Sequence, residues 1–342
     1  MDAKTDDSMG FIQELVWNYR DGKRIRDDAY GPRQLGCRFV PKLSKDPIAH
    51  PAFMRAESQI ALLHLNWREI RDVSAMLLMG QSGVGKTYLL EHYAKRIAPI
   101  QRADRMTRPV LYIRVPSRPS GLDLAERMLA ALGFPIIKNK ERRQTDALVA
   151  KLDKFEVELI FIDELQHALE DREWDIKTFG NWMKDFCDNS GRPVVCATQP
   201  SGARIILENV QLRRRFERFC TLEPFEMEPT ERWDEYLNVL YTIHTRMPLP
   251  APDFSEPELA MRFYFASGSC IDFIIKIANA SLAIAARQGS SIDLEVLAEA
   301  CEEVIWKKKV PKSLNPFLCD ISELRHLRAP GEPYAKWDEF QI

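Results

Sequence analysis

A glycine-rich run directly after a short apolar segment constrains this chain more than any other feature. The apolar residues 75–79 are followed by Gly80-Gln81-Ser82-Gly83-Val84-Gly85-Lys86-Thr87, and a helical pattern begins at Tyr88. A strand, a loop with this spacing of Gly, Lys and Thr, and a helix together form a phosphate-binding loop. Its backbone N–H groups and the helix N-terminus both favour phosphate. We therefore predict a nucleoside triphosphate site, and a chance glycine turn is disfavoured by the complete pattern.

The residues at the end of this loop have separate predicted roles. The Lys86 ammonium would reach the β- and γ-phosphates, and the Thr87 hydroxyl would be a ligand of Mg²⁺. We therefore expect ATP and Mg²⁺ as cofactors. The predicted nucleotide contacts are Gly80, Gln81, Ser82, Gly83, Val84, Gly85, Lys86, Thr87 and Tyr88.

Polar residues follow two later apolar segments at the points where strands would end. Asp163 and Glu164 come directly after residues 159–162, and Thr198 follows residues 194–197. At the carboxyl edge of a parallel sheet, these side chains would lie beside the phosphate loop. Asp163 would hold Mg²⁺ through water, and Glu164 would orient the water that attacks the γ-phosphate. The alternatives are a solvated acidic turn for the carboxylates and ordinary turn chemistry for Thr198.

The order of the elements predicts an α/β fold. Strand patterns over 75–79, 110–115, 159–162 and 194–197 alternate with helical patterns over 88–97, 122–132 and 179–187. This alternation indicates a parallel sheet covered on both faces. A helix over 51–71 precedes the first strand. After Pro224 only helical patterns remain, over 231–246, 256–266, 271–287 and 293–309.

Four parts of the chain are therefore expected. They are an N-terminal extension (1–50), a nucleotide-binding core (51–224), an all-helical domain (225–309) and a tail (310–342). The tail mixes prolines with isolated aromatic residues. It is expected either to order on a partner protein or to dock as a strap on the helical domain.

Composition excludes several classes of protein. The 342 residues carry a formal charge of −2 and are 45% hydrophobic, so the chain as a whole does not resemble a basic nucleic-acid binder. Seven cysteines without a CxxC pair disfavour a disulfide framework. The start of the chain is polar and acidic, and no apolar run approaches the length of a membrane span. We expect a cytoplasmic protein without a membrane partner.

Residues 211–219 contain four arginines and are predicted to be helical. One of these arginines would project across a subunit boundary and neutralise transition-state charge on a neighbour's ATP, as an arginine finger does. A solvated basic helix face is the alternative.

These elements, in this order, resemble the TniB/TnsC-type transposition regulators among the AAA+ ATPases. The resemblance spans about 51–305 and rests on "LLMGQSGVGKTYLL", "LIFIDELQHAL" and "RPVVCATQPSGARIILENVQLRRRF". It implies an AAA+ P-loop core with a helical lid, and an ATPase that forms a ring or filament on double-stranded DNA. The implied partners are a TniQ-like target-selection protein and a transposase. The resemblance assigns sensing of the γ-phosphate to Thr198 and the arginine finger to Arg215.

One position departs from the pattern of many AAA+ lids. Ile271 occupies the position at which many AAA+ lids have the sensor-2 arginine. Either Lys276 substitutes for it, or the lid does not contact the γ-phosphate. No winged-helix domain, as in replication initiators, is expected after Lys309.

Two segments are locally basic. Residues 102–118 hold five arginines against Asp104, and residues 138–143 form the second segment. The resemblance implies DNA contacts at Arg118, Lys138, Asn139 and Lys140, whereas ordinary surface charge is the alternative. A helicase-loader or initiator ATPase, and a signalling ATPase that does not bind DNA, remain alternative functions. Targeting by a CRISPR effector or by a DNA-binding protein is left open.

Overall fold

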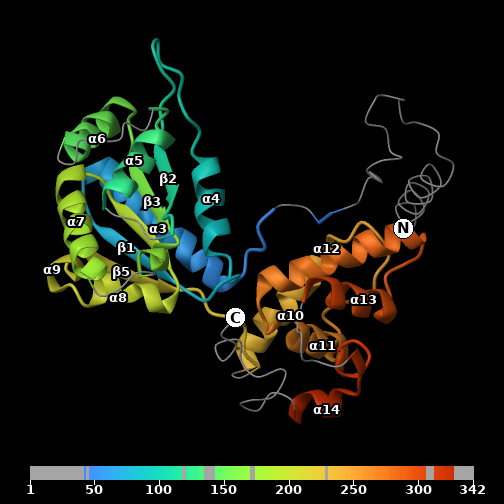
Figure 1. The fold of residues 1–342 in the computed structure, drawn as a ribbon. Coiled ribbons are helices and arrows are strands. Elements are labelled where there is room, and N and C mark those ends of the chain that lie inside the picture. The colour runs from blue at the N-terminus through green and yellow to red at the C-terminus, as the bar shows by residue number, and fades with distance from the viewer. Residues whose placement is uncertain are drawn as a thin grey trace. The chain divides into compact units, whose positions relative to one another are not determined.

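The fold was analysed in a computed structural model, which describes residues 42–43, 46–117, 121–134, 143–169, 174–227, 230–305 and 312–326. The chain divides into two compact units (Figure 1). One unit comprises Ala49–Glu223, and the other comprises Met1–Ile48 together with Pro224–Ile342.

The unit Ala49–Glu223 is built on a five-stranded sheet in which every neighbouring pair is parallel. The strand order is β2-β3-β4-β1-β5. The strands are β1 (Ala75–Met79), β2 (Val110–Arg114), β3 (Leu159–Asp163), β4 (Val194–Thr198) and β5 (Phe216–Thr221). This confirms the predicted α/β fold with a parallel sheet.

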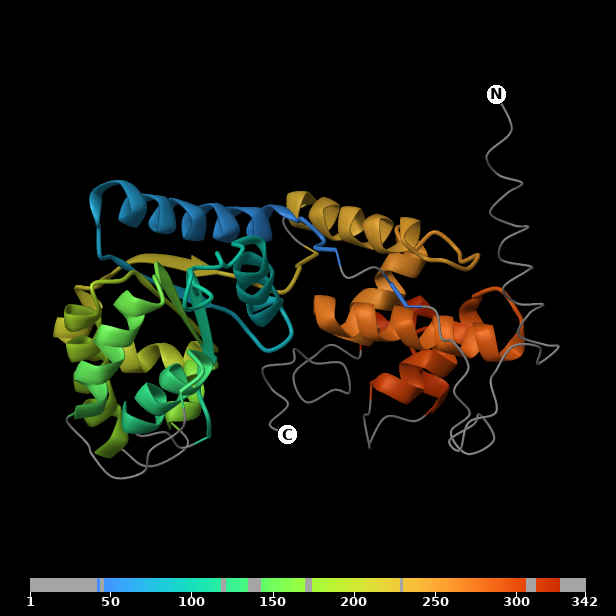
Figure 2. The ribbon, with the colours of Figure 1, turned by 90° about the horizontal axis from the view of Figure 1, so that it is seen from above.

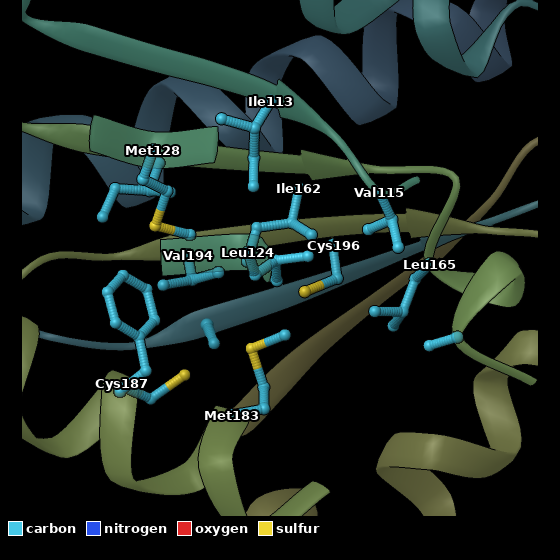
Figure 3. Packing of buried hydrophobic residues seen from close by; sticks show 14 of the residues in the cluster. Ile113, Val115, Leu124, Met128, Ile162, Leu165, Met183, Cys187, Val194 and Cys196 are labelled. Atoms are coloured by element: carbon cyan, nitrogen blue, oxygen red, sulfur yellow. The ribbon is translucent and has the colours of Figure 1, made fainter. Parts of the chain in front are cut away.

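Both faces of the sheet are buried in apolar clusters. Neighbouring residues along each central strand point to opposite sides, so each strand contributes to both clusters. In β3, Ile160 and Ile162 belong to one apolar cluster, whereas Leu159 and Phe161 belong to the other. Figure 3 shows the first cluster, where Met183 and Cys187 lie across from Val194 and Cys196 of β4. Burying a large apolar side chain contributes about 1.5–3 kcal/mol, so each face is a substantial core.

Helices cover the two faces separately. In Figure 2, α3 and α4 lie on one side of the sheet and α5, α6 and α7 on the other. These helices are α3 (Pro51–Ile70), α4 (Lys86–Arg96), α5 (Gly121–Ala131), α6 (Arg143–Lys154) and α7 (Trp174–Ser190). Short turns of helix connect the strands further along: η1 (Leu165–Leu169), η2 (Pro200–Ala203), α8 (Arg204–Leu207) and α9 (Val210–Arg213).

The prediction of a helix over residues 211–219 is wrong for most of that segment. Helix α9 ends at Arg213, and β5 begins at Phe216. The apolar residue Leu212 is buried in the helix and Phe216 in the strand, because β5 pairs with β1 at the sheet edge. The arginines on either side of this junction give the segment no strand-like alternation, which explains the error.

The second unit is helical in its described residues after Pro224. Its helices are α10 (Thr230–Thr245), α11 (Pro257–Ser267), α12 (Ile271–Gln288), α13 (Leu294–Val304), η3 (Lys312–Leu314) and α14 (Ile321–His326). Left-handed glycines end α11 at Gly268 and α12 at Gly289, as is usual for a helix C-terminus. The side chain of Asp293 caps α13 by accepting from the N–H of Val296 at 2.9 Å.

The described part of the predicted tail packs into this helical unit. Phe317 is fully buried with its ring 5.1 Å from that of Phe263, and Leu324 is buried with Phe265. The buried Arg262 of α11 donates to the carbonyl oxygens of Pro316 at 2.8 Å and of Cys319 at 2.9 Å. Residues 312–326 are therefore a strap on the helical unit, which was the alternative considered for the tail.

Part of the predicted N-terminal extension also belongs to the helical unit. The N–H of Leu43 donates to the side chain of Asn279 at 2.9 Å, and Arg246 donates to the carbonyl oxygen of Asp46 at 2.8 Å. In the described residues, no single helix is long and apolar enough to span a membrane, and the one helix pair with sufficient length and composition is bent by 109°.

Candidate nucleotide site

The phosphate loop lies between β1 and α4 and depends on its glycines. Gly83 and Gly85 have φ angles of 81° and 99°, in the left-handed region that favours glycine. Gly80 is confined by space, because an added Cβ would lie 2.3 Å from the carbonyl oxygen of Leu222. Its N–H donates to the carbonyl oxygen of Thr198 at 3.2 Å, which ties the loop to the end of β4.

Lys86 begins α4 and directs its ammonium group back into the loop. Its side chain is buried, with an exposed fraction of 6%, and Nζ donates to the carbonyl oxygens of Gly80 at 2.6 Å and Gln81 at 2.7 Å. A buried ammonium requires such partners. The arrangement holds a positive charge where the loop would receive phosphate oxygens.

Asp163 is fully buried at the end of β3 and accepts three hydrogen bonds. The Thr87 hydroxyl donates to Oδ2 at 2.7 Å, the Tyr112 hydroxyl donates to the same oxygen at 2.9 Å, and the N–H of Glu164 donates to Oδ1 at 2.9 Å. Burial and the adjacent Asp163 carboxylate raise the pKa of Tyr112, so this phenol stays a donor at neutral pH. The predicted metal residues Thr87 and Asp163 are therefore in direct contact.

These two oxygen groups suit Mg²⁺, which prefers hard oxygen ligands and usually keeps waters or phosphate oxygens in its shell. The described residues contain no cluster of three or more His, Cys, Asp or Glu side chains that would form an all-protein metal cage. A cation here would be held by Thr87 and Asp163 together with nucleotide and water oxygens.

Glu164 and Thr198 are connected through one side chain, that of Gln166 in η1. The Gln166 amide nitrogen donates to Oε2 of Glu164. Its amide oxygen accepts from the N–H of Gln199 at 3.2 Å and lies 3.3 Å from the Thr198 hydroxyl, whose single proton is shared with the Gln199 carbonyl oxygen at 3.0 Å. Glu164 has a φ angle of 60°, which is uncommon for a non-glycine residue. The predicted residues Glu164 and Thr198 therefore lie at the carboxyl edge of the sheet, within one hydrogen-bonded group.

Gly202 in η2 permits this group to form. An added Cβ would lie 2.1 Å from Oγ1 of Thr198 and 2.7 Å from Cα of Gln166. No side chain larger than hydrogen fits there without a shift of both neighbours. η1 and η2 therefore meet backbone to backbone beside the predicted catalytic residues.

The arginine proposed as a finger lies at the other end of the sheet. The carbonyl oxygen of Arg215 accepts from the N–H of Ala75, at the start of β1, at 3.0 Å. Since β1 rises about 3.3 Å per residue, Arg215 lies about 16 Å from the phosphate loop that follows this strand. Its guanidinium forms an ion pair with Asp188 of α7 at 2.7 Å, with half of the arginine side chain exposed. Arg213 and Arg214 are both exposed.

The predicted DNA contacts Arg118, Lys138, Asn139 and Lys140 lie outside the described residues. In the described part of the first basic segment, Arg102 makes two hydrogen bonds to Glu156, at 2.9 and 2.6 Å, and Arg105 lies 3.5 Å from the same carboxylate. Part of the arginine charge is therefore compensated within the chain.

Two further predicted residues occupy well-defined places. Tyr88 in the first turn of α4 stacks on His92, with ring centroids 6.1 Å apart. Lys276 of α12 forms an ion pair with Asp272 at 2.7 Å. Nucleotide contact by either residue stays a prediction.

Sequence reasoning missed Tyr112, Gln166 and Gly202. Tyr112 reads as an ordinary residue of a buried strand, and only the pairing of β2 with β3 brings it to Asp163. Gln166 lies within the "IDELQH" motif, so its position two residues after Glu164 was a usable signal. Gly202 lies two residues after Pro200, where a glycine ordinarily indicates no more than a turn.

Comparisons with known proteins identify a family and a fold. The chain matches the family described as Bacterial TniB protein over residues 43–227. A search of curated protein sequences finds no match. Among solved structures, Cdc6p from Pyrobaculum aerophilum is similar at 15% identity and a TM-score of 0.53, covering 75% of this chain and 68% of that one.

Two proteins of Aeropyrum pernix are also similar. The ORC2 protein, in ADPNP–ADP complexes, has 16% identity and a TM-score of 0.55, covering 78% of this chain and 70% of that one. The ORC1 protein in complex with DNA has 16% identity and a TM-score of 0.56, covering 76% and 67%. At these identities the similarity shows a shared fold, which is the AAA+ fold.

Proposed function

Because this chain belongs to the TniB family and is an ATPase of the AAA+ class, we propose that it is an ATP-dependent regulator of DNA transposition. In this proposal it assembles on double-stranded DNA and links target-site selection to recruitment of a transposase. The observation that carries the proposal is the family match over residues 43–227, which includes the whole nucleotide site.

The roles proposed for the site residues follow from their positions. Lys86 and the loop N–H groups bind the phosphates of ATP, and Thr87 and Asp163 hold Mg²⁺. Glu164 orients the attacking water, and Thr198 contacts the γ-phosphate or that water from the end of β4. Arg215 completes the site of a neighbouring protomer, because its own phosphate loop lies at the opposite sheet end.

DNA binding is proposed to depend on phosphate contacts from the basic segments. Arg118 and residues 138–140 carry these contacts. The ORC1 protein of similar fold was solved in complex with DNA, which makes duplex DNA a reasonable ligand for this fold. Phosphate contacts bind without regard to sequence, so target choice requires a separate selection protein.

The test measures duplex binding with ATP and without nucleotide at several salt concentrations. Wild-type protein should bind in an ATP-dependent and salt-dependent manner, and Lys138→Ala/Lys140→Ala should lower affinity equally for unrelated sequences and reduce the salt slope. Lys95→Ala/Lys154→Ala removes the same charge from α4 and α6 and serves as the matched control. A wild-type protein that shows no duplex binding at low salt would contradict the proposal and favour the signalling alternative.

Transposase recruitment needs a separate measurement. Wild-type protein bound to DNA with ATP should retain a transposase of the DDE class on the duplex, and the Lys86→Ala protein should not. An ATPase that instead retains a replicative helicase would favour the loader or initiator alternative.

A further inference from the structure

The side chain of Gln166 bridges two parts of the site that come from different strands. Glu164 follows β3, and Thr198 and Gln199 follow β4. Gln166 contacts all three through a single planar amide.

The chemistry of the partners determines the orientation of this amide. A backbone N–H can only donate, so the partner of the Gln199 N–H must be the amide oxygen. An ionised carboxylate can only accept, so the partner of Glu164 must be the amide nitrogen. One orientation satisfies both contacts, and the flipped orientation satisfies neither. A displacement at the end of β4 would therefore act on Glu164 through a rigid group.

The backbone that carries Gln166 is itself anchored. Leu165 and Ala168, on either side of it in η1, are buried in the apolar cluster below the sheet. On the opposite side, the missing Cβ of Gly202 lets η2 approach the Cα of Gln166 closely. The left-handed conformation of Glu164 begins the turn that leads into η1. Gln166 thus has little freedom to move without breaking one of its contacts.

We propose that Gln166 is a positioning residue for ATP hydrolysis. It holds the Glu164 carboxylate at a set place relative to Thr198, so that the water-orienting group and the phosphate-contacting group move together. The proposal rests on the proposed role of Glu164 in hydrolysis and extends it to a residue that contacts no reacting atom. Loss of Gln166 should therefore lower kcat and leave the affinity for ATP unchanged, because Gln166 orients the Glu164 carboxylate and does not bind the nucleotide.

The test compares three substitutions in η1. Gln166→Leu keeps most of the side-chain volume and removes all three hydrogen-bond contacts of the amide. Gln166→Glu keeps an acceptor for the Gln199 N–H but places a second carboxylate against Glu164. Leu169→Ala, in the same short helix, loses apolar packing and leaves the bridge intact, so it controls for lower stability.

Both Gln166 variants should lower kcat by about 10- to 100-fold, as loss of a hydrogen bond to a charged group does. The KM for ATP and the Kd for a non-hydrolysable analogue should stay within about twofold of wild type. Leu169→Ala should lower the Tm while keeping kcat within about twofold. In single-turnover measurements, Gln166→Leu and Thr198→Val combined should cost less than the product of their separate effects, because they interrupt one bridge.

Two results would overturn the proposal. One is a Gln166→Leu protein with wild-type kcat, and the other is a variant whose loss appears entirely in nucleotide affinity. Glu164→Gln is measured in parallel. If Glu164→Gln blocks hydrolysis and Gln166→Leu does not slow it, only the positioning role of Gln166 is refuted. If Glu164→Gln hydrolyses ATP at the wild-type rate, the role proposed for Glu164 is refuted, and so is the positioning role of Gln166.

Discussion

The Thr87 hydroxyl donates a hydrogen bond of 2.7 Å to Oδ2 of Asp163. Thr87 is the second residue of α4, the helix after β1, and Asp163 ends β3, two strands away in the sheet. The two proposed metal-binding groups therefore meet through the parallel register of the strands, with β4 between them. This contact organises the site around Asp163.

Lys86 and Glu164 should separate binding from hydrolysis. Lys86→Ala removes the cation that faces the phosphates, so ATP binding should be lost by equilibrium titration with a fluorescent nucleotide. Glu164→Gln keeps this cation, so it should bind ATP normally and hydrolyse it at least about 100-fold more slowly. Equal ATP affinities for Lys86→Ala and wild type would contradict the assignment of the loop.

Arg215 should act in trans. Arg215→Ala protein should hydrolyse ATP slowly by itself, and mixing it with Lys86→Ala protein should restore activity, since the second protein supplies an intact arginine to the first protein's site. Asp188→Ala is the matched control, because it breaks the same exposed ion pair, which is worth at most about 1 kcal/mol, and keeps the arginine. An Arg215→Ala protein with unchanged steady-state ATPase would refute the assignment.

Gly202→Ala should destabilise the nucleotide-binding unit by about 1–3 kcal/mol, because the new methyl group overlaps Thr198 and Gln166. Thermal denaturation should show a lower Tm for the unit. Ser201→Ala changes the exposed neighbour in the same short helix and should leave the Tm within about 1 °C of wild type. A Gly202→Ala protein as stable as Ser201→Ala would mean that the two short helices separate easily.

Residues 312–326 should be required for the helical unit. Truncation after Ile305 removes the buried Phe317 and the two carbonyl partners of Arg262, so the unit should unfold at a lower temperature or become insoluble. Truncation after His326 keeps these contacts and should retain the wild-type Tm. Phe317→Ala in the full chain should cost about 3–5 kcal/mol. Equal melting temperatures for both truncations would contradict the strap.

The stability of the nucleotide-binding unit should fall in mild acid because of His50. Burial, and secondarily the nearby Arg55, lower the pKa of His50 to about 4 from 6.5. Between these values the unfolded chain binds the proton and the folded chain does not, so the free energy of unfolding decreases as pH falls from 6.5 towards 4. The decrease is at most about 1.4 kcal/mol per pH unit for this group. Urea titrations should show that the free energy of unfolding of His50→Leu decreases less between pH 6.5 and 4 than that of wild type. Identical pH dependences for the two proteins would refute the role of His50.

The sequence was sufficient for those parts of the fold that depend on local pattern. The P-loop motif and the alternation of apolar segments predicted the parallel sheet, with the ends of β1 to β4 within one residue of those observed, whereas α6 was not predicted. β5 was missed because its buried residue Phe216 stands among arginines, and only pairing with β1 makes a strand of it. A non-local contact decided that element, and no window of neighbouring residues contains it.

The site residues likewise fall into those that local sequence motifs predict and those that depend on non-local contacts. Lys86, Thr87, Asp163 and Glu164 were predicted because motif spacing encodes their roles, and the structure brings them to one edge of the sheet. Tyr112 depends on strand order, which sequence patterns do not encode. Phe317 read as an isolated aromatic residue among prolines, and its burial depends on a complementary surface formed by α11.

The position of Arg215 has a consequence for the number of working sites in an assembly. Because Arg215 and the phosphate loop of the same chain lie at opposite ends of β5 and β1, a lone protomer that relies on this arginine is incomplete. An open filament would then always contain one site fewer than its number of protomers, whereas closure into a ring would complete every site. The specific activity per protomer would rise with filament length towards a plateau, and its approach to that plateau would report the mean length of the assembly.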